Sequence, residues 1–391
     1  MIDVNKEAEE IFEQLLAWRR DFHRHPELGY ELDRTARIVA THLKSLGMEV
    51  TEHVGKTGVV GLLKGGKPGE VLAMRADMDA LPIQEATGLE FSSEIPGVMH
   101  ACGHDGHTAM LMGVAAILSK YREYIKGSVK FIFQPAEEGG NGAGAMVKDG
   151  VLENPRPDAI MAAHMMFDEA GTITIRKGYA FLASDTFHIK VRGHGGHGCK
   201  PHESTDTLLA ACKIVTDIQM IVARKISPQD VATVTVGTIH SGTKENIIPG
   251  EAELTGTVRT LRPEVRQRVI QGLHEICQGV CAAIGTTYEM DYKQNCAPVY
   301  NDPALMTVFE KAIIRMLGKE KVLEANLSRP GLEDFSAYLQ DGIPGGYLWI
   351  GGAYPGEKVP SKNHQPPYNW DENAMKTGVI AQTAAALEYL N

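Results

Sequence analysis

The sequence lacks the features of disulfide-rich, membrane-spanning and nucleic-acid-binding proteins. Its 391 residues include only six cysteines, and these do not form the ladder of close pairs that a disulfide framework needs. No apolar run approaches the roughly 20 residues required to cross a bilayer, and the acidic N-terminus lacks the apolar core of a secretion signal. The net charge of -10 and the absence of a Lys/Arg block argue against a nucleic-acid surface. We therefore expect a soluble, cytoplasmic protein with reduced thiols.

The composition that remains is that of a globular protein long enough for two domains. Apolar residues make up 43% and charged residues 23% of the chain, which is ordinary for a soluble fold, and 391 residues can support two separate cores. Strand and helix patterns alternate over residues 48–164 and again from 303 onward, which predicts an α/β layer with a mostly parallel sheet. Residues 184–297 instead read strand, helix, strand, strand, helix, strand, the ferredoxin-like order of an α+β domain. The sequence therefore predicts one discontinuous domain, 1–183 and 298–391, interrupted by an inserted domain at 184–297.

The segment Met99–His107 has the highest density of reactive side chains. It contains one thiol, three imidazoles and one carboxylate, and it precedes an apolar run that predicts a helix over Thr108–Leu118. Cys102 and His104 are two residues apart, so on an extended backbone their side chains would project to the same side. A thiolate and an imidazole directed at one point suit a metal of the zinc type. Two ligands do not complete a site, so further ligands must come from elsewhere in the chain.

Other metal-capable side chains stand at the ends of predicted strands in the larger domain. These are Asp77 and Asp79 after Val71–Ala76, Glu137 and Glu138 after Val129–Gln134, and His164 after Ala159–Ala163. Ligands of open α/β sheets bind at the carboxyl ends of the strands, so we expect these residues to lie together. His364, in a proline-rich loop before the last predicted helix, is a further candidate. Each residue alone could be a loop cap, a solvated charge or a core histidine, and only their convergence predicts a site.

The adjacent glutamates Glu137 and Glu138 indicate a reaction as well as a binding site. Neighbouring side chains diverge, so one glutamate can bind a metal ion while the other faces the water that the metal activates. A metal ion lowers the pKa of bound water from about 15.7 toward 7, and the free carboxylate can then accept its proton. This division of roles is typical of a hydrolase.

Two alternatives use the same residues differently. In a cysteine hydrolase, Cys102 would be the nucleophile and His104 or His107 its base, with the nearby helix start lowering the thiol pKa. That hypothesis leaves Glu137 and Glu138 without roles. In a binding protein the site would be a structural zinc site, but such sites are closed by four protein ligands, often paired cysteines, and Met99–His107 contains a single cysteine.

The chain resembles the metal-dependent aminoacylase, carboxypeptidase and hippurate-hydrolase superfamily. It is most similar to the amidohydrolase branch, which includes bacterial N-acyl-amino-acid amidohydrolases, hippurate hydrolases and plant auxin-conjugate hydrolases. The motifs that carry the resemblance occur in order along almost the whole chain: His23–Gly29, Arg75–Pro82, Met99–His107, Gln134–Gly139, Gly195–Gly198, Asn246–Pro249 and Glu333–Phe335. The stretch Met165–Phe167 departs from the proline-containing turn of many relatives, so the resemblance implies no particular acyl group.

The resemblance implies a catalytic larger domain that binds two divalent metal ions, with Zn, Mn, Co and Ni as candidates. The implied ligands are Cys102, His104, Glu138, His164 and His364. Cys102 would bridge the two ions, and Glu137 would be the general base and later the proton donor to the leaving amine. Asp77, Asp79 and His107 would support the ligands from behind. The choice of His104 over His100 and His107 as the ligand rests on the family, because spacing alone leaves it open.

The inserted domain resembles the lid or dimerisation domain of the same family. There His197 matches a residue that reaches a neighbouring active site and stabilises an oxyanion, while Asn246 and Arg259 match positions that hold the substrate carboxylate. The implied reaction is hydrolysis of the amide bond of N-acyl-L-amino acids, with a dipeptidase or carboxypeptidase of the superfamily as the alternative. The implied partners are the small-molecule substrate and further copies of the chain, in a homodimer or homotetramer, without nucleic acid or membrane.

Overall fold

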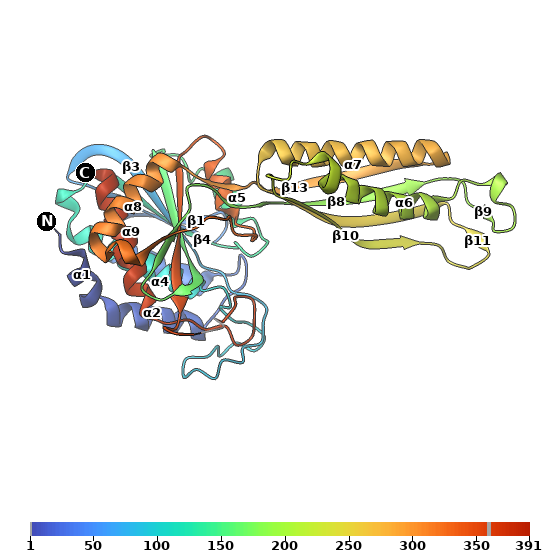
Figure 1. Cartoon of the computed structure of the whole chain (residues 1–391). Helices are drawn as coiled ribbons and strands as arrows, with labels where there is room; N and C mark the ends of the chain where they lie inside the picture. Colours follow the sequence, from blue (N-terminus) through green and yellow to red (C-terminus); the bar gives the residue numbers. More distant parts are fainter. Residues whose placement is uncertain (1, 358–360) are drawn as a thin grey trace. The chain divides into compact units, whose positions relative to one another are not determined.

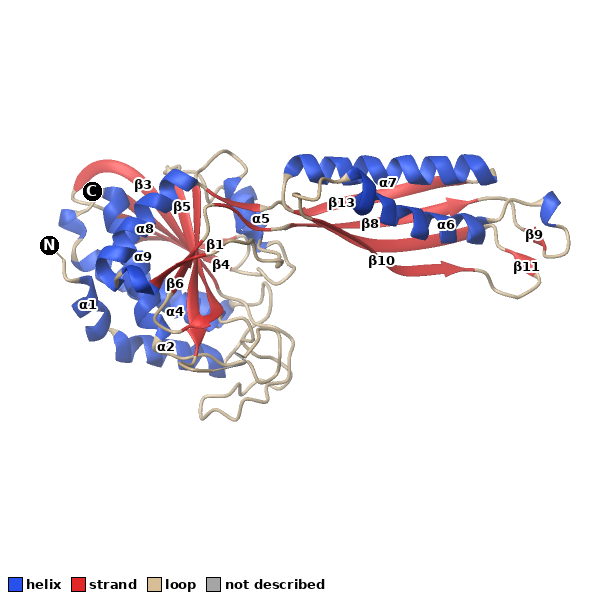
Figure 2. Cartoon of the chain, in the orientation of Figure 1, coloured by secondary structure: helices blue, strands red, loops and turns tan. Residues whose placement is uncertain are grey.

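The computed structural model describes residues 2–357 and 361–391, so positions 1 and 358–360 of the predicted larger domain lie outside it. The chain divides into two compact units. The first unit comprises Met1–Ala180, Tyr300–Ser328 and Asp334–Asn391, and the second unit comprises Phe181–Val299 and Arg329–Glu333. Figure 1 traces the chain through both units, and Figure 2 shows their helices and strands. The return of Arg329–Glu333 to the second unit has no counterpart in the predicted boundaries.

The first unit is built on a sheet that contains ten strands within the described residues. Its main path has the order β1-β2-β4-β3-β5-β16-β14-β7, and β6 and β15 lie off this path. The strands are β1 (Glu49–Val54), β2 (Gly58–Lys64), β3 (Lys67–Asp77), β4 (Lys126–Gln134), β5 (Ala159–Glu169), β6 (Ile173–Ile175), β7 (Gly178–Phe181), β14 (Val299–Asn301), β15 (Val322–Glu324) and β16 (Gly345–Ala353). Strands β4, β3, β5 and β16 are parallel, whereas β1 and β2 are antiparallel. This arrangement confirms the predicted α/β layer with a mostly parallel sheet.

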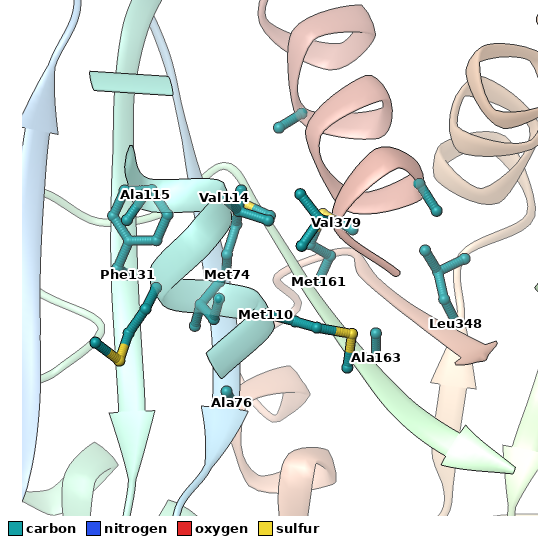
Figure 3. Packing of buried hydrophobic residues seen from close by; sticks show 14 of the residues in the cluster. Met74, Ala76, Met110, Val114, Ala115, Phe131, Met161, Ala163, Leu348 and Val379 are labelled. Atoms are coloured by element: carbon teal, nitrogen blue, oxygen red, sulfur yellow. The ribbon is translucent and has the colours of Figure 1, made fainter. Parts of the chain in front are cut away.

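Helices cover the sheet of the first unit, and one of them is almost entirely buried. The helices are α1 (Val4–Glu10), α2 (Phe12–Arg24), α3 (Asp33–Ser45), α4 (His104–Lys120), α5 (Gly142–Lys148), α8 (Pro303–Leu317) and α9 (Ala374–Leu390). Helix α4 contacts β3, α2 and α9, and Figure 3 shows Met110 and Val114 among buried side chains of the sheet and Val379 of α9. Each fully buried side chain of this size contributes roughly 1.5–3 kcal/mol. The packing therefore fixes α4, and with it the start of the helix at His104.

Two local predictions in this unit are wrong. Helix α4 begins at His104 rather than Thr108, and Gly103, with φ 89°, turns the chain in the left-handed region just before it. Cys102 and His104 therefore do not share an extended backbone. Strand β5 does not end at His164 but continues to Glu169, because residues beyond His164 still pair with β16.

The second unit is a four-stranded antiparallel sheet with two helices. The strands are β8 (Ala183–Arg192), β10 (Ala232–Ser241), β12 (Glu251–Thr260) and β13 (Thr287–Cys296), and the helices are α6 (Thr207–Met220) and α7 (Pro263–Ile284). The sheet order β10-β12-β8-β13 and the chain order strand, helix, strand, strand, helix, strand are those of a ferredoxin-like fold. Apolar side chains of both helices and the sheet form a separate core. A short ribbon, β9 (Gly196–His197) paired with β11 (Ile247–Ile248), is separate from this sheet.

The helices carry no sign of a membrane span. Within residues 2–357 and 361–391, none combines the length and the apolar character needed to cross a bilayer.

Candidate metal centre

Five polar residues that are far apart in the sequence come together in the first unit. Cys102, His104 and His164 form one group, and Cys102, Glu138 and His364 form another; in each group the potential ligand atoms lie within 4.8 Å of one another. The Sγ atom of Cys102 is 3.4 Å from Nε2 of His164, and Nε2 of His364 is 3.1 Å from Oε1 of Glu138. Cys102 belongs to both of these groups, so its thiolate would serve either of them.

Backbone carbonyl groups orient the two histidines of the first group. Nδ1 of His104, the first residue of α4, lies 2.8 Å from the carbonyl oxygen of Asp79. Nδ1 of His164, in β5, lies 2.7 Å from the carbonyl oxygen of Met165. A carbonyl oxygen can only accept a hydrogen bond, so each Nδ1 carries the proton and each Nε2 is left as an electron-pair donor. This is how second-layer contacts prepare imidazole ligands for a metal ion.

Asp79 also holds the backbone of the glutamate pair. Its carboxylate accepts hydrogen bonds from the amide groups of Glu137 (3.0 Å) and Glu138 (3.1 Å). Ala136 precedes them with φ 52°, so the chain turns sharply after β4. With the backbone fixed there, the carboxylate of Glu138 lies in the same ligand group as Cys102. Glu137 is buried, with an exposed fraction of 7%. A carboxylate oxygen of Glu137 lies within 4.8 Å of potential ligand atoms of His104 and Glu138. The two side chains thus take different places beside one centre.

Asp77 lies behind the centre in a buried charge network. Its carboxylate accepts hydrogen bonds from Arg75 (2.7 Å) and from Nδ1 of His107 (2.6 Å). Burial favours the neutral acid, but the neighbouring His104, Arg75 and His107 outweigh it and hold the pKa of Asp77 well below its usual value. Arg75 also donates to Asp334 (3.1 Å). Asp334 belongs to the motif Glu333–Phe335, but its place in this network appears only in the structure.

His23 and His100 belong to a different part of the first unit. Nδ1 of His23 lies 2.8 Å from Asp105, and its Nε2 lies 3.2 Å from Glu85. Arg19 also donates to Asp105 (2.9 Å), so this buried network ties α2 to the start of α4. His100 is buried, its ring nitrogens have no hydrogen-bond partner among the described residues, and burial lowers its pKa to about 3. Neither histidine takes part in the two groups around Cys102.

Two features of the site around Cys102 suit a metal ion: the types of its donor atoms, and buried polar atoms that lack a hydrogen-bond partner among the described residues. Nε2 of His104 and Oε1 of Glu138 are buried and have no hydrogen-bond partner with good geometry among the described residues. Contacts with Cys102 and Glu138 raise the pKa of His364 to about 10, so a proton occupies this position when no other cation is present. Thiolate, imidazole and carboxylate are the ligands that Zn²⁺ and related ions prefer.

The second unit contains the remaining candidate site residues, His197, Asn246 and Arg259, and Arg259 lies apart from the other two. His197 lies in β9 and Asn246 directly precedes β11, the strand that pairs with β9, and both residues line a cavity of about 750 Å³. Nδ1 of His197 accepts a hydrogen bond from the Cys199 amide (3.3 Å), so the proton of the neutral ring is on the exposed Nε2. Glu251, the first residue of β12, lines the same cavity as His197. Arg259 pairs with Ser184 near the other end of this strand. At roughly 3.3 Å per residue, Arg259 is about 26 Å from that start of the strand, so one second unit does not bring His197 and Arg259 together.

Comparison with known proteins identifies the family to which this chain belongs. The model of the peptidase family M20/M25/M40 matches residues 73–388. The chain belongs to this family. It is 42% identical to an N-acyl-L-amino acid amidohydrolase of Geobacillus stearothermophilus over 76% of this chain and 81% of the relative. It is 39% identical to thermostable carboxypeptidase 1 of Saccharolobus solfataricus over 99% and 98% of the two chains.

Solved structures agree with this assignment. The Bacillus subtilis YXEP protein, described as a dinuclear metal-binding peptidase of the M20 family, is 35% identical and has a TM-score of 0.85. The match covers 98% of this chain and 99% of that chain. Membership of M20/M25/M40 confirms the predicted resemblance and makes the chain a hydrolase of amide bonds. The binding-protein hypothesis is therefore excluded.

Proposed function

We propose that this M20/M25/M40 member hydrolyses N-acyl-L-amino acids with two metal ions held by Cys102, His104, Glu138, His164 and His364. The observation that carries the proposal is the position of Cys102, which belongs to two ligand groups at once. Each group has three donors from the chain, fewer than the four that close a structural zinc site. Ions held by these residues would therefore be of the catalytic kind and not of the closed structural kind.

The residues of the chain then have separate tasks in the reaction. Metal ions bound there supply an acidified water and a polarised carbonyl group. Glu137 accepts the proton of the attacking water and later gives it to the leaving amine, because it lies beside the ligand groups without belonging to either group around Cys102. Nε2–H of His197 donates to the oxyanion, and Asn246 and Arg259 bind the substrate carboxylate.

We further propose that the second unit is a lid and dimerisation domain. The separation of His197 from Arg259 supports this proposal, since both can contact one substrate only if they come from different copies of the chain. Strand β10 is an edge of the sheet, and Ile239 on it is exposed, as are Leu209 and Met220 of α6. Unpaired edges and exposed apolar side chains favour association with another copy. The proposed state is a homodimer or a tetramer built from such dimers.

A carboxypeptidase activity is the second candidate, favoured by the relatives that bear that name. In the peptide substrate of a carboxypeptidase, the last residue carries the rest of the peptide as an acyl group on its nitrogen. Such a peptide is therefore itself an N-acyl amino acid. The two functions therefore share a reaction and differ in the size of the acyl group. We also propose a cytoplasmic location, supported by six free cysteines in the described residues.

The experiment that tests the function combines metal exchange with a substrate panel. The protein is stripped with a chelator, reconstituted separately with Zn, Mn, Co and Ni, and assayed on N-acetyl, N-benzoyl and indole-acyl amino acids and on dipeptides. We expect activity to disappear on stripping and to return with metal. Turnover by the stripped protein would support a Cys102 nucleophile instead, and the better substrate class separates aminoacylase from carboxypeptidase.

A further inference from the structure

His107 lies one helical turn after His104 in α4 and uses both nitrogens of its ring. Nδ1 is 2.6 Å from Oδ1 of Asp77, and Nε2 is 2.8 Å from the backbone nitrogen of Met165. A backbone N–H can only donate, so Nε2 accepts this bond and Nδ1 carries the ring proton. The side chain is buried, with an exposed fraction of 2%. In this arrangement His107 has no free lone pair to offer a metal ion.

The residue whose backbone amide His107 binds, Met165, also contacts a proposed ligand through its carbonyl group, which belongs to the following peptide group. The carbonyl oxygen of Met165 accepts the Nδ1–H bond of His164 at 2.7 Å, and Nε2 of His164 lies 3.4 Å from Sγ of Cys102. The contacts thus run without a break from Asp77 through His107, the Met165 backbone and His164 to Cys102.

The sheet explains why a side chain is needed at this point. Strand β3 pairs with β5 only as far as Ala162, so Met165 lies beyond the reach of that neighbour. A buried amide without a partner is costly, and His107 satisfies it from α4. Because α4 is fixed by its own packing, the bond to the Met165 amide holds the peptide group between His164 and Met165. This fixes the backbone on which the ring of His164 is carried and places the Met165 carbonyl that its Nδ1 contacts.

We infer that His107 is a positioning residue that sets the orientation of His164 through the backbone of Met165 and is not itself a metal ligand. This inference rests on the proposed two-metal function. A competing arrangement exists, because potential ligand atoms of Asp77, His104 and His107 also lie within 4.8 Å of one another. For His107 to bind a metal ion there, it would have to give up the bond to Asp77 or the bond to Met165.

The test measures metal binding rather than turnover. Stepwise affinities for Zn²⁺ and Co²⁺ are determined by competition with a chromophoric chelator, and the cobalt–thiolate absorption of Cys102 reports the ligand geometry. We expect His107→Phe to bind two ions still, one of them about 10–100-fold more weakly, with a changed cobalt spectrum. His107→Gln should recover part of the loss, because its amide oxygen can accept the Met165 N–H. The matched control is His42→Phe, which removes a histidine contact to the Met112 carbonyl of the same helix and should leave both affinities unchanged.

A double mutant separates positioning from ligation. If His107 acts only through His164, then His164→Ala combined with His107→Phe should bind metal no more weakly than His164→Ala alone. A further loss in the double mutant would show that His107 is a ligand, and unchanged affinities in a folded His107→Phe protein would show that it has no role. Should either substitution prevent folding, nitrogen chemical shifts of the wild-type imidazoles decide the question, since the inference requires the Nδ1–H tautomer of His107 with and without metal. A wild-type protein that binds fewer than two ions contradicts the proposed function itself.

Discussion

The two places where this chain carries its candidate catalytic groups differ in how each group is held. In the first unit the side chains around Cys102 are mostly buried, and a second residue fixes each histidine of its first ligand group. In the second unit His197 is exposed, and its ring accepts a 3.3 Å hydrogen bond from the backbone amide of Cys199, two residues along the chain. The first arrangement suits metal ligands, whose positions must be set to within a fraction of an ångström.

The exposed arrangement suits a group that meets its substrate only after another surface has approached. The cavity lined by His197 contains several glycines and one lysine, Lys244, and its wall is a two-stranded ribbon instead of a packed sheet. Substitutions in the buried centre should therefore affect metal content and folding, whereas substitutions in the ribbon should affect turnover alone. Four predictions test this contrast.

Replacing the proposed base should have the largest effect. Glu137→Gln keeps the size of the side chain but cannot accept a proton, so kcat should fall by about 10²–10⁴-fold while both metal ions stay bound. Metal analysis and steady-state kinetics on an N-acetyl amino acid check this. Glu138→Gln is the matched control, because it should lose metal as well as activity. Normal turnover by Glu137→Gln would contradict the mechanism.

The exposed histidine should show a kinetic effect without a structural one. His197→Ala should lower kcat by about 10²–10³-fold, and metal content and melting temperature should stay at the wild-type values, since the side chain is exposed. His202→Ala, an exposed histidine a few residues further on, is the control. An unchanged kcat would remove the oxyanion role, and a large drop in melting temperature would remove the contrast between the two regions.

Mixing the two inactive variants should restore part of the activity. If His197 serves the site of a second copy, then a dimer of one Glu137→Gln chain and one His197→Ala chain has one complete site. Random exchange makes half of the dimers mixed, each with one complete site of two, so about a quarter of wild-type activity should return. Activity is measured before and after subunit exchange, and a mixture that stays inactive despite exchange would show that His197 acts within its own chain.

The smallest effect concerns the buried network beside the centre. Burial opposes ionisation of Glu85, but hydrogen bonds from His23 and Thr87 outweigh it and lower its pKa from the usual 4.5 to about 2. A carboxylate with a lowered folded-state pKa stabilises the fold above pH 4.5 and loses this contribution as the pH falls toward 2. The stability difference between wild type and Glu85→Gln should be about 2 kcal/mol near pH 6 and should shrink between pH 4.5 and 3.

Thermal denaturation at several pH values checks this last prediction. Glu90→Gln, at an exposed position of the same segment, should show no such dependence. A difference for Glu85→Gln that stays constant across the range would mean that its carboxylate does not contribute through its charge.

Much of the fold could be predicted because strand and helix patterns depend on burial, which is visible in the residue order. Helix α8 has the bounds that the sequence predicts, Pro303–Leu317, since Asp302 caps it and Pro303 suits its first turn. The start of α4 was missed because Gly106 argues against a helix. In the structure Trp370 lies so close that a Cβ at Gly106 would be 2.6 Å from its ring, so tertiary packing requires this glycine.

The short strands were also invisible in the sequence. Strands of two or three residues, such as β9 and β11, are too short to show a period of two. Their pairing nevertheless decides that His197 and Asn246 share a cavity while Arg259 lies elsewhere.

The sequence by itself determined the chemistry of this protein: a thiol, imidazoles and carboxylates at the ends of strands, and two adjacent glutamates, specify metal-assisted hydrolysis through the types of their donor atoms. It left open which histidines bind metal, since His100, His104 and His107 are equivalent as residue types. The tertiary structure distinguishes them, because the free nitrogen of an imidazole depends on what the other nitrogen contacts. Those partners, Asp79 for His104 and Asp77 with Met165 for His107, come from other parts of the sequence and meet the rings only in the folded chain.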